Sequence, residues 1–279
     1  MKNTLRRCAG RFVLMIPFAA FLYSPSVASA GLLGSAVSFA VLAGSTVTNT
    51  DNTTINGDLG VWPGSAYTGG GTVIQTGTVY LANGVAMTAE GDTTNAYNYL
   101  AGLPALHDLS GTDLGGLTLF PGVYFFSSSA GLTGTLTLNA NNDPNALFVF
   151  QIKSQLTTAP NAAVNVINGT AGTGVFWQVG SSAVVDTGTT FEGNILALSS
   201  ITLNTGATDC GRALARNGEV SLEGNNISDS CGTATDFGSG AFASNNLPAP
   251  VPEPGTVLLL GVGLLAVVLR GWQSRKRVA

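Results

Sequence analysis

Short runs of apolar and β-branched residues, separated by Gly, Asn and Thr, follow one another through the middle of the chain. In LTGTLTL at 132–138, leucines alternate with threonines, which is the period of a strand with one face in a core and the other in solvent. The Gly and Asn residues between runs indicate tight turns. The pattern predicts an all-β domain over residues 31–235. The predicted strands include 72–74, 132–138, 147–152, 175–179, 183–185, 201–203 and 220–222.

An eighteen-residue repeat shows which all-β architecture to expect. VGSSAVVDTGTTFEGNIL at 179–196 aligns without a gap on ALSSITLNTGATDCGRAL at 197–214, and a less regular third copy follows from Arg216. Apolar positions are kept in both copies. This period is too short for a propeller blade and fits one solenoid coil of three short strands and three corners. The conserved inward pairs are Ala183 with Ile201, Val185 with Leu203, Ile195 with Ala213, and Ala197 with Ala215.

One segment departs from the strand pattern. Residues 88–101 begin with Thr88, a candidate N-cap, and carry Glu90 and Asp92 in the first turn, where the helix dipole favours acidic groups. Gly102 follows as a stop signal. We therefore expect a single α-helix at about 88–101, packed alongside the solenoid.

The first thirty residues have the pattern of a secretory signal peptide. A basic start precedes an apolar run at 12–23 that is too short to cross a bilayer, and Ala28-Ser29-Ala30 is a small-residue cleavage site. Signal peptidase is therefore an expected processing partner, and the mature chain is expected to begin at Gly31.

The other end of the chain carries a second targeting pattern. Pro252, Glu253 and Pro254 precede an apolar stretch at 256–269 and a basic tail, and the segment 236–250 before them reads as a linker. Residues 251–279 resemble the PEP-CTERM sorting signal, which implies cleavage by a membrane-bound exosortase. The apolar stretch is marginal for a full membrane span and is expected to anchor the chain transiently. An ordinary single-helix anchor is the alternative.

Charge and cysteine usage agree with export. Residues 31–250 contain three basic and fourteen acidic residues, a net charge of about −11, which argues against nucleic acid as a partner. Cys210 and Cys231 are the cysteines of this part, and an isolated pair in an oxidising compartment favours a disulfide. They lie slightly more than one coil apart, so a bridge between neighbouring coils is feasible. Two unpaired buried thiols are the alternative.

Several stretches together resemble one known family. LLGSAVSFAVLAGSTVTN at 32–49, INGDLGVWPG at 55–64, LTLFPGVYFF at 117–126 and VFWQVGSSA at 175–183 are similar to the bacterial and fungal ice-binding proteins, long catalogued as a domain of unknown function. The resemblance spans nearly all of residues 31–229. It implies a discontinuous β-solenoid of triangular cross-section with one helix alongside, and ice binding as the activity. Asp209 departs from the family pattern, which usually has an apolar residue there.

Ice binding requires a rigid, flat and weakly hydrated array that holds waters at lattice-like intervals. Solenoid coils stack about 4.8 Å apart, and threonine supplies a stiff rotamer with a methyl group and a hydroxyl. The repeated phrases DTGTTFEG and NTGATDCG supply such threonines. The same residues also serve the turns of many solenoids, which is the structural alternative. The candidate ice-binding residues are Thr187 with Thr205, Thr190 with Thr208, and Asn225 or, preferred, Asn226.

Enzymatic interpretations find little support in the residues. His107 is the sole histidine, so neither a catalytic triad nor a histidine-based metal site can be assembled, and the acids are scattered. We assign no catalytic residues, metal ligands or cofactors. The alternative to ice binding is a structural or adhesive surface protein that is sorted into an exopolysaccharide matrix and contacts polysaccharide. A solenoid enzyme acting on glycans is a third, less favoured hypothesis.

Overall fold

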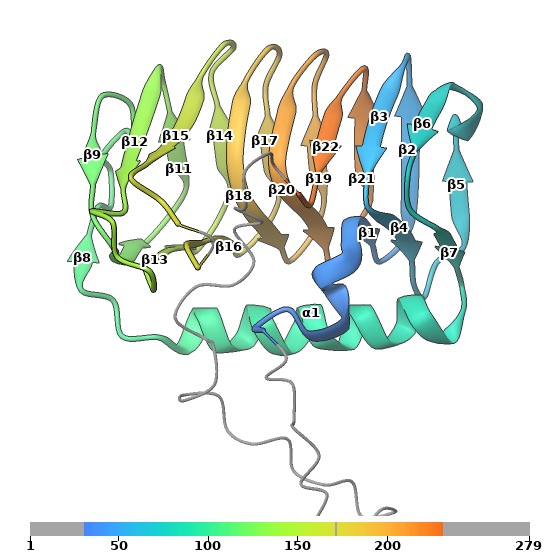
Figure 1. Ribbon diagram of the computed structural model, residues 1–279, viewed down its shortest axis with the longest axis horizontal. Coiled ribbons are helices and arrows are strands. Elements are labelled where there is room, and N and C mark those ends of the chain that lie inside the picture. Colours follow the sequence, from blue (N-terminus) through green and yellow to red (C-terminus); the bar gives the residue numbers. More distant parts are fainter. Residues whose placement is uncertain (1–30, 171, 231–279) are drawn as a thin grey trace, which may run out of the picture.

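The structure, a computed structural model, describes residues 31–170 and 172–230. Its strands stack side by side in parallel as the coils of a β-solenoid, and one helix runs along the outside (Figure 1). The predicted all-β solenoid with a single α-helix is confirmed within these ranges. The helix is α1 (Gly84–Gly102), and two short 3-10 helices are η1 (Gly34–Ser38) and η2 (Gly70–Thr72).

The strands form two sheets. The seven-stranded sheet consists, in spatial order, of β11 (Ala130–Leu132), β14 (Leu156–Thr158), β17 (Ala183–Val185), β19 (Ile201–Leu203), β21 (Val220–Glu223), β2 (Thr46–Thr50) and β5 (Ala66–Thr68). The fifteen-stranded sheet contains β1 (Phe39–Ala43), β3 (Thr53–Asn56), β4 (Asp58–Val61), β6 (Val73–Gln75), β7 (Val79–Leu81), β8 (His107–Asp108), β9 (Thr118–Leu119), β10 (Gly122–Phe126), β12 (Thr135–Asn139), β13 (Leu147–Ile152), β15 (Ala163–Ile167), β16 (Gly174–Val179), β18 (Thr190–Ala197), β20 (Thr208–Ala215) and β22 (Asn226–Ser228).

The larger sheet covers two sides of the solenoid because its long strands bend. The first residue of β18 pairs with β15, whereas its last four residues pair with β16. Gly193, with φ 120°, lies at this bend, and a β-carbon there would come within 2.6 Å of Val175. With the seven-stranded sheet as the third side, each coil is three-sided.

The coils are not stacked in chain order. β20, β21 and β22, near the end of the described chain, pair with β1, β2 and β3 near its beginning. From there the chain winds outward to β5, β6 and β7, and α1 carries it along the whole stack to β8 at the opposite end (Figure 1). The discontinuity that the family resemblance implied is confirmed.

The eighteen-residue repeat is the coil itself. β18 lies beside β20 over eight consecutive pairs, from Thr190 with Thr208 to Ala197 with Ala215. β17 lies beside β19 in the same alignment. The inward residues predicted from the repeat are all fully buried or nearly so.

Two local predictions need correction. LTGTLTL is split into β11 and β12, because Gly134 takes φ 85° and turns a corner between them, although its leucines are all buried. The helix begins at Gly84, not at Thr88. Its N-cap is Asn83, whose Oδ1 accepts a hydrogen bond from the Ala86 amide at 3.0 Å, while the Thr88 hydroxyl donates to the Gly84 carbonyl.

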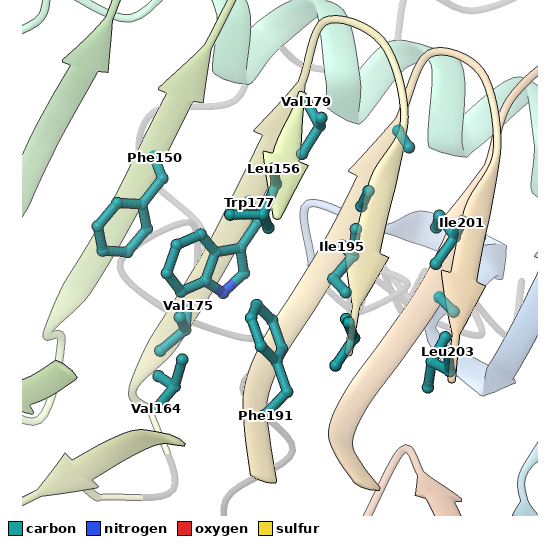
Figure 2. Packing of buried hydrophobic residues seen from close by; sticks show 14 of the residues in the cluster. Phe150, Leu156, Val164, Val175, Trp177, Val179, Phe191, Ile195, Ile201 and Leu203 are labelled. Carbon is teal, nitrogen blue, oxygen red and sulfur yellow. The ribbon is translucent and has the colours of Figure 1, made fainter. Parts of the chain in front are cut away.

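The core has two parts. Inside the solenoid, Tyr124, Phe150, Trp177 and Phe191 form a file of aromatic rings, with Phe150 and Trp177 stacked at 3.9 Å between centroids. Figure 2 shows the last three of these rings. Outside it, α1 covers apolar side chains that point outward from β1, β13, β16, β18 and β20. The helix thus hides a sheet face that would otherwise be an exposed apolar surface.

Several predictions fall wholly or partly on residues that are not described. The signal peptide 1–30, the linker 236–250, the sorting segment 251–279 with Pro252, Glu253 and Pro254, and Cys231 lie outside the described ranges. Cys210 is described and lies half-buried on β20. Within the described residues, no helix is long and apolar enough to cross a membrane.

Candidate functional site

The repeated Thr-Gly-x-Thr phrase forms the corner that leads from the seven-stranded sheet into the next side of the coil. Gly188, Gly206 and Gly224 take φ values of 67°, 70° and 62° at the same point of successive corners. A residue with a β-carbon is strained in this left-handed conformation, and Asn161, with φ 58°, is the tolerated substitute one coil earlier. The turn therefore requires a residue that tolerates this left-handed conformation, and glycine meets the requirement in each copy of the phrase.

Hydrogen bonds between neighbouring coils fix these corners. The Asn204 amide donates to Asp186 Oδ1 at 2.9 Å, and the Thr187 N–H donates to the same oxygen at 2.7 Å. These two bonds hold the pKa of Asp186 below its usual value. On the inner side, the Asn225 amide donates to the carbonyls of Asn204 and Ala207, at 2.9 and 3.0 Å. The corners therefore form a preorganised surface.

The predicted side chains stack on the outside of these corners. Thr190 pairs with Thr208 and Thr208 with Asn226, so these three residues form one file. The Gly188 amide donates to the Thr205 carbonyl, which places Thr187 and Thr205 in a second file. All are exposed except Thr208, which is half-buried. We call Thr187, Thr190, Thr205, Thr208 and Asn226 the corner ladder.

The structure decides between the two asparagines of the third copy. Asn225 is buried at the corner, 4% exposed, and its side chain is used in hydrogen bonds to the preceding coil. Asn226 begins β22 and is exposed. Asn226 is thus the one that continues the file of Thr190 and Thr208.

The file of Thr190 extends further than the repeat indicated. Ala163 and Thr135 precede Thr190 on β15 and β12, and Thr54 follows Asn226 on β3. Thr54 was missed because it lies far from Asn226 along the chain, and a repeat search finds neighbours only in chain order. The file of Thr187 is interrupted after Thr205 by Glu223, beyond which Thr50 follows.

A second surface of small side chains lies on the seven-stranded sheet and was not predicted. Its outward residues in successive strands are Thr157, Val184, Thr202, Ser221 and Thr48. The Thr48 hydroxyl lies 3.2 Å from that of Ser221 and donates to it. The sequence pattern could have predicted this surface, because its residues alternate with buried ones in each strand. This sheet face is the natural comparison for the corner ladder.

Apart from Glu223, which continues the file of Thr187 and Thr205, ionisable groups lie beside the corner ladder. Glu192, on the next outward file of β18, is half-buried and accepts a hydrogen bond from the Val166 N–H at 2.6 Å. Burial raises its pKa, and this hydrogen bond opposes the rise. In the described ranges, no three His, Cys, Asp or Glu residues are grouped so as to hold a metal ion. His107 stacks on Tyr124 at 5.0 Å, at the end of the aromatic file.

Comparison with known proteins matches both predicted regions. A family model described as Ice-binding-like matches residues 41–228, and one for the PEP-CTERM protein-sorting motif matches residues 250–276. An ice-binding protein of Nostoc sp. (strain HG1) is 49% identical over 267 residues, which cover 92% of this chain and 95% of that protein. Ice-binding protein 1 of Shewanella frigidimarina (strain NCIMB 400) is 32% identical over 227 residues, which cover 70% of this chain and 25% of that protein.

Solved structures of ice-binding proteins are similar to this chain in both fold and sequence. The crystal structure of an ice binding protein from an Antarctic biological consortium has a TM-score of 0.67 and 48% identity, and the match covers 70% of this chain and 89% of that one. The ice-binding protein of the Antarctic ascomycete Antarctomyces psychrotrophicus also has a TM-score of 0.67, with 37% identity and coverage of 70% and 96%. These neighbours have the same fold as the described solenoid.

Proposed function

Because the chain belongs to the ice-binding-like family, we propose that it is an exported protein that adsorbs to ice through the corner ladder. The observation that carries this proposal is the register that stacks Thr190, Thr208 and Asn226 on successive coils. Adsorption alone would inhibit the growth or recrystallisation of ice. No covalent chemistry, cofactor or metal is part of this activity.

The spacing and rigidity of the corner ladder suit adsorption to ice. Successive coils repeat each threonine about every 4.8 Å, and the β-branched side chain has few rotamers to lose on binding. Each threonine offers a methyl group, which holds water weakly, and a hydroxyl, which can take the place of a lattice hydrogen bond. The hydrogen bonds at Asp186 and Asn225 fix the corners before ice is met, so little conformational entropy is lost on adsorption.

The first test replaces two ladder residues with bulkier ones. We expect Thr190→Tyr/Thr208→Tyr, made in residues 31–250, to reduce ice-recrystallisation inhibition at least tenfold, because the rings lift the surface off the ice. The measurement is ice grain size during annealing, at a series of protein concentrations. Circular dichroism and the unfolding temperature should stay close to the parent values, because both side chains point to solvent.

The matched control lies on the other candidate surface. Thr202→Tyr places the same ring at the outward file of the seven-stranded sheet. Retained activity here, together with loss in the ladder variant, supports the corner ladder. The opposite outcome moves the ice-binding surface to the sheet, and normal grain coarsening with the parent protein rejects ice binding altogether.

The sorting motif implies export toward the cell surface, and we propose a processing order for it. Signal peptidase cleaves after Ala30, the apolar stretch at 256–269 holds the chain in the membrane transiently, and exosortase then cleaves near Pro252-Glu253-Pro254. We also propose that Cys210 and Cys231 form a disulfide after export. Mass spectrometry of the exported protein tests all of these, since each cleavage fixes a terminus and the disulfide removes two hydrogens.

The motif match also keeps a second candidate function open. Exosortase-sorted proteins can remain in a surface matrix, so the same solenoid would serve as a structural or adhesive protein that contacts exopolysaccharide. A glycan array separates the two functions. Saturable glycan binding without ice activity in the parent protein would favour the adhesive function.

A further inference from the structure

At the end of the solenoid farthest from β8, the described residues leave the last coil open. β5, β6 and β7 form the last coil, and each pairs on one side only, with β2, β3 and β4 respectively (Figure 1, right). Their outer edges therefore present unpaired N–H and C=O groups in the described ranges. Such edges are sites for the addition of another strand.

The core layer of this last coil is also uncovered. Val79 and Leu81 pair with Leu59 and Val61, which point into the solenoid and are fully buried. In the last coil the same inward positions are 40% and 38% exposed. The layer has the composition of a core but lacks a neighbour on one side.

Apolar exposure concentrates at this end. Of the large hydrophobic residues that are exposed in the described ranges, five lie between residues 74 and 87, on β6, β7 and the first turn of α1. β5, β6 and β7 contain no charged residue. Ile74 pairs with Thr54 at an outward position, whereas Val79 and Leu81 belong to the inward layer of the last coil. An uncharged apolar layer that is partly exposed beside unpaired strand edges indicates a docking site. The five are Ile74 at 69%, Val79, Leu81, Val85 at 47% and Met87 at 48%.

The chain itself continues close to this surface. Ser228 pairs with Asn56 on β3, and β3 pairs with β6, so β22 ends two strand spacings, about 10 Å, from the open edge. The twenty residues at 231–250 that follow can span up to about 66 Å when extended. They carry a single charged residue, Asp236, and three large apolar ones, Phe237, Phe242 and Leu247.

We propose that residues 231–250 cover the open end, add an extended strand to the edge of β6, and place Phe237 and Phe242 on the layer of Val79 and Leu81. The segment is long enough to reach this surface, carries little charge, and has two aromatic side chains that can cover the exposed core layer. The segment thus acts as a cap built from the stretch that leads to the sorting motif. This proposal is independent of ice binding.

The test measures hydrogen–deuterium exchange of the full chain in detergent, compared with Phe237→Ser/Phe242→Ser. We expect amides of residues 73–75 and 79–81 to exchange at least tenfold faster in the variant, while those of 201–203 in the middle of the stack stay unchanged. Phe120→Ser is the matched control, because Phe120 is 53% exposed at the opposite end of the solenoid. It should leave the exchange of residues 73–81 unchanged.

Two outcomes would overturn the proposal. Equal exchange at residues 73–81 in the parent and the double variant would mean that the phenylalanines do not cover this end. Protection that rises with protein concentration and persists in the double variant would assign the surface to a second copy of the chain. Ice-recrystallisation inhibition of the double variant should match the parent, so loss of the cap and loss of the ice-binding surface remain distinguishable.

Discussion

Asp209 occupies an inward position of β20, between Phe191 and Ile227 of the neighbouring coils. It is 1% exposed, and neither carboxyl oxygen has a hydrogen-bond partner among the described residues. Burial raises its pKa well above the usual value, although Arg212 opposes the rise. Burial therefore favours the protonated carboxyl in the folded chain, whereas the same group in the unfolded chain ionises above about pH 4. Glu90 behaves similarly, since burial raises its pKa to about 8 against the opposing charge of Arg216.

The sign of the resulting pH dependence follows from linkage. Both pKa values are raised in the folded state, so the stabilisation is complete below the unfolded pKa and is lost as the pH rises toward the folded value. Each such carboxyl lowers the free energy of unfolding by about 1.4 kcal/mol per pH unit in this window. We expect Asp209→Val to raise stability at pH 7 and to make the decline of stability with rising pH shallower.

Urea unfolding at several pH values measures this effect. Glu219→Gln is the control, because Glu219 is exposed and its removal should leave the slope unchanged. An identical decline in the parent and Asp209→Val would show that Asp209 is not protonated in the folded state.

At the scale of elements, the C-terminal end of α1 is fixed by a strand. Gln151 on β13 is 3% exposed and donates to the carbonyls of Leu100 and Leu103, at 2.7 and 2.8 Å. Leu100 lies in the last turn of the helix, where its carbonyl also accepts from the Leu103 N–H at 3.4 Å, and Leu103 is the C-cap. Near the middle, Asp92 accepts hydrogen bonds from the N–H and the hydroxyl of Ser35, at 2.7 and 2.6 Å. Asp92, which the sequence placed in the first helical turn, therefore lies beyond that turn and ties the helix to η1.

We expect Gln151→Leu to destabilise the protein by about 1–3 kcal/mol, because the Leu103 carbonyl loses this donor and the Leu100 carbonyl keeps only the long bond from the Leu103 N–H. Denaturant unfolding measures this, and faster amide exchange at residues 97–103 would localise it. Gln155→Leu, at a half-buried position between β13 and β14 of the same coil, should cost less than about 0.5 kcal/mol. Equal losses in both variants would contradict the capping role of Gln151.

At the scale of the whole molecule, the joint between the chain's first and last coils holds the stack together. Arg212 on β20 is 1% exposed and donates from Nε and Nη2 to the Val37 carbonyl, at 2.8 and 2.6 Å, and from Nη1 to Asn194 Oδ1 at 2.9 Å. We expect Arg212→Met to lower the free energy of unfolding by at least about 2 kcal/mol, because it strips donors from buried acceptors.

Exchange mass spectrometry locates this loss. Residues 41–43 and 213–215, which pair across the joint, should exchange faster, whereas 130–132 at the far end should change least. A uniform increase over all coils would show that the joint is no weaker than the rest of the stack.

The sequence predicts which residues are neighbours only where coils that are consecutive in the chain are also adjacent in the stack. Within residues 179–214, consecutive coils are neighbours in space, so the repeat was sufficient to place Thr190 beside Thr208 and Ile201 beside Ala183. Across the joint it was not, because Thr54 and Asn226 meet only after the chain has run the length of the stack and returned. The open end was missed for a related reason. The short strands 66–68 and 79–81 have the same pattern as those of other coils, and only the structure shows that they lack a neighbour on one side.

The helix spans the stack from end to end, and this fixes a relation between two lengths. Nineteen helical residues rise about 28 Å, and the six intervals of the seven-stranded sheet measure about 29 Å. The length of the helix therefore matches the number of stacked coils. A duplication that added one coil would make the stack about 5 Å longer than the helix, so the helix would have to gain about three residues to span it.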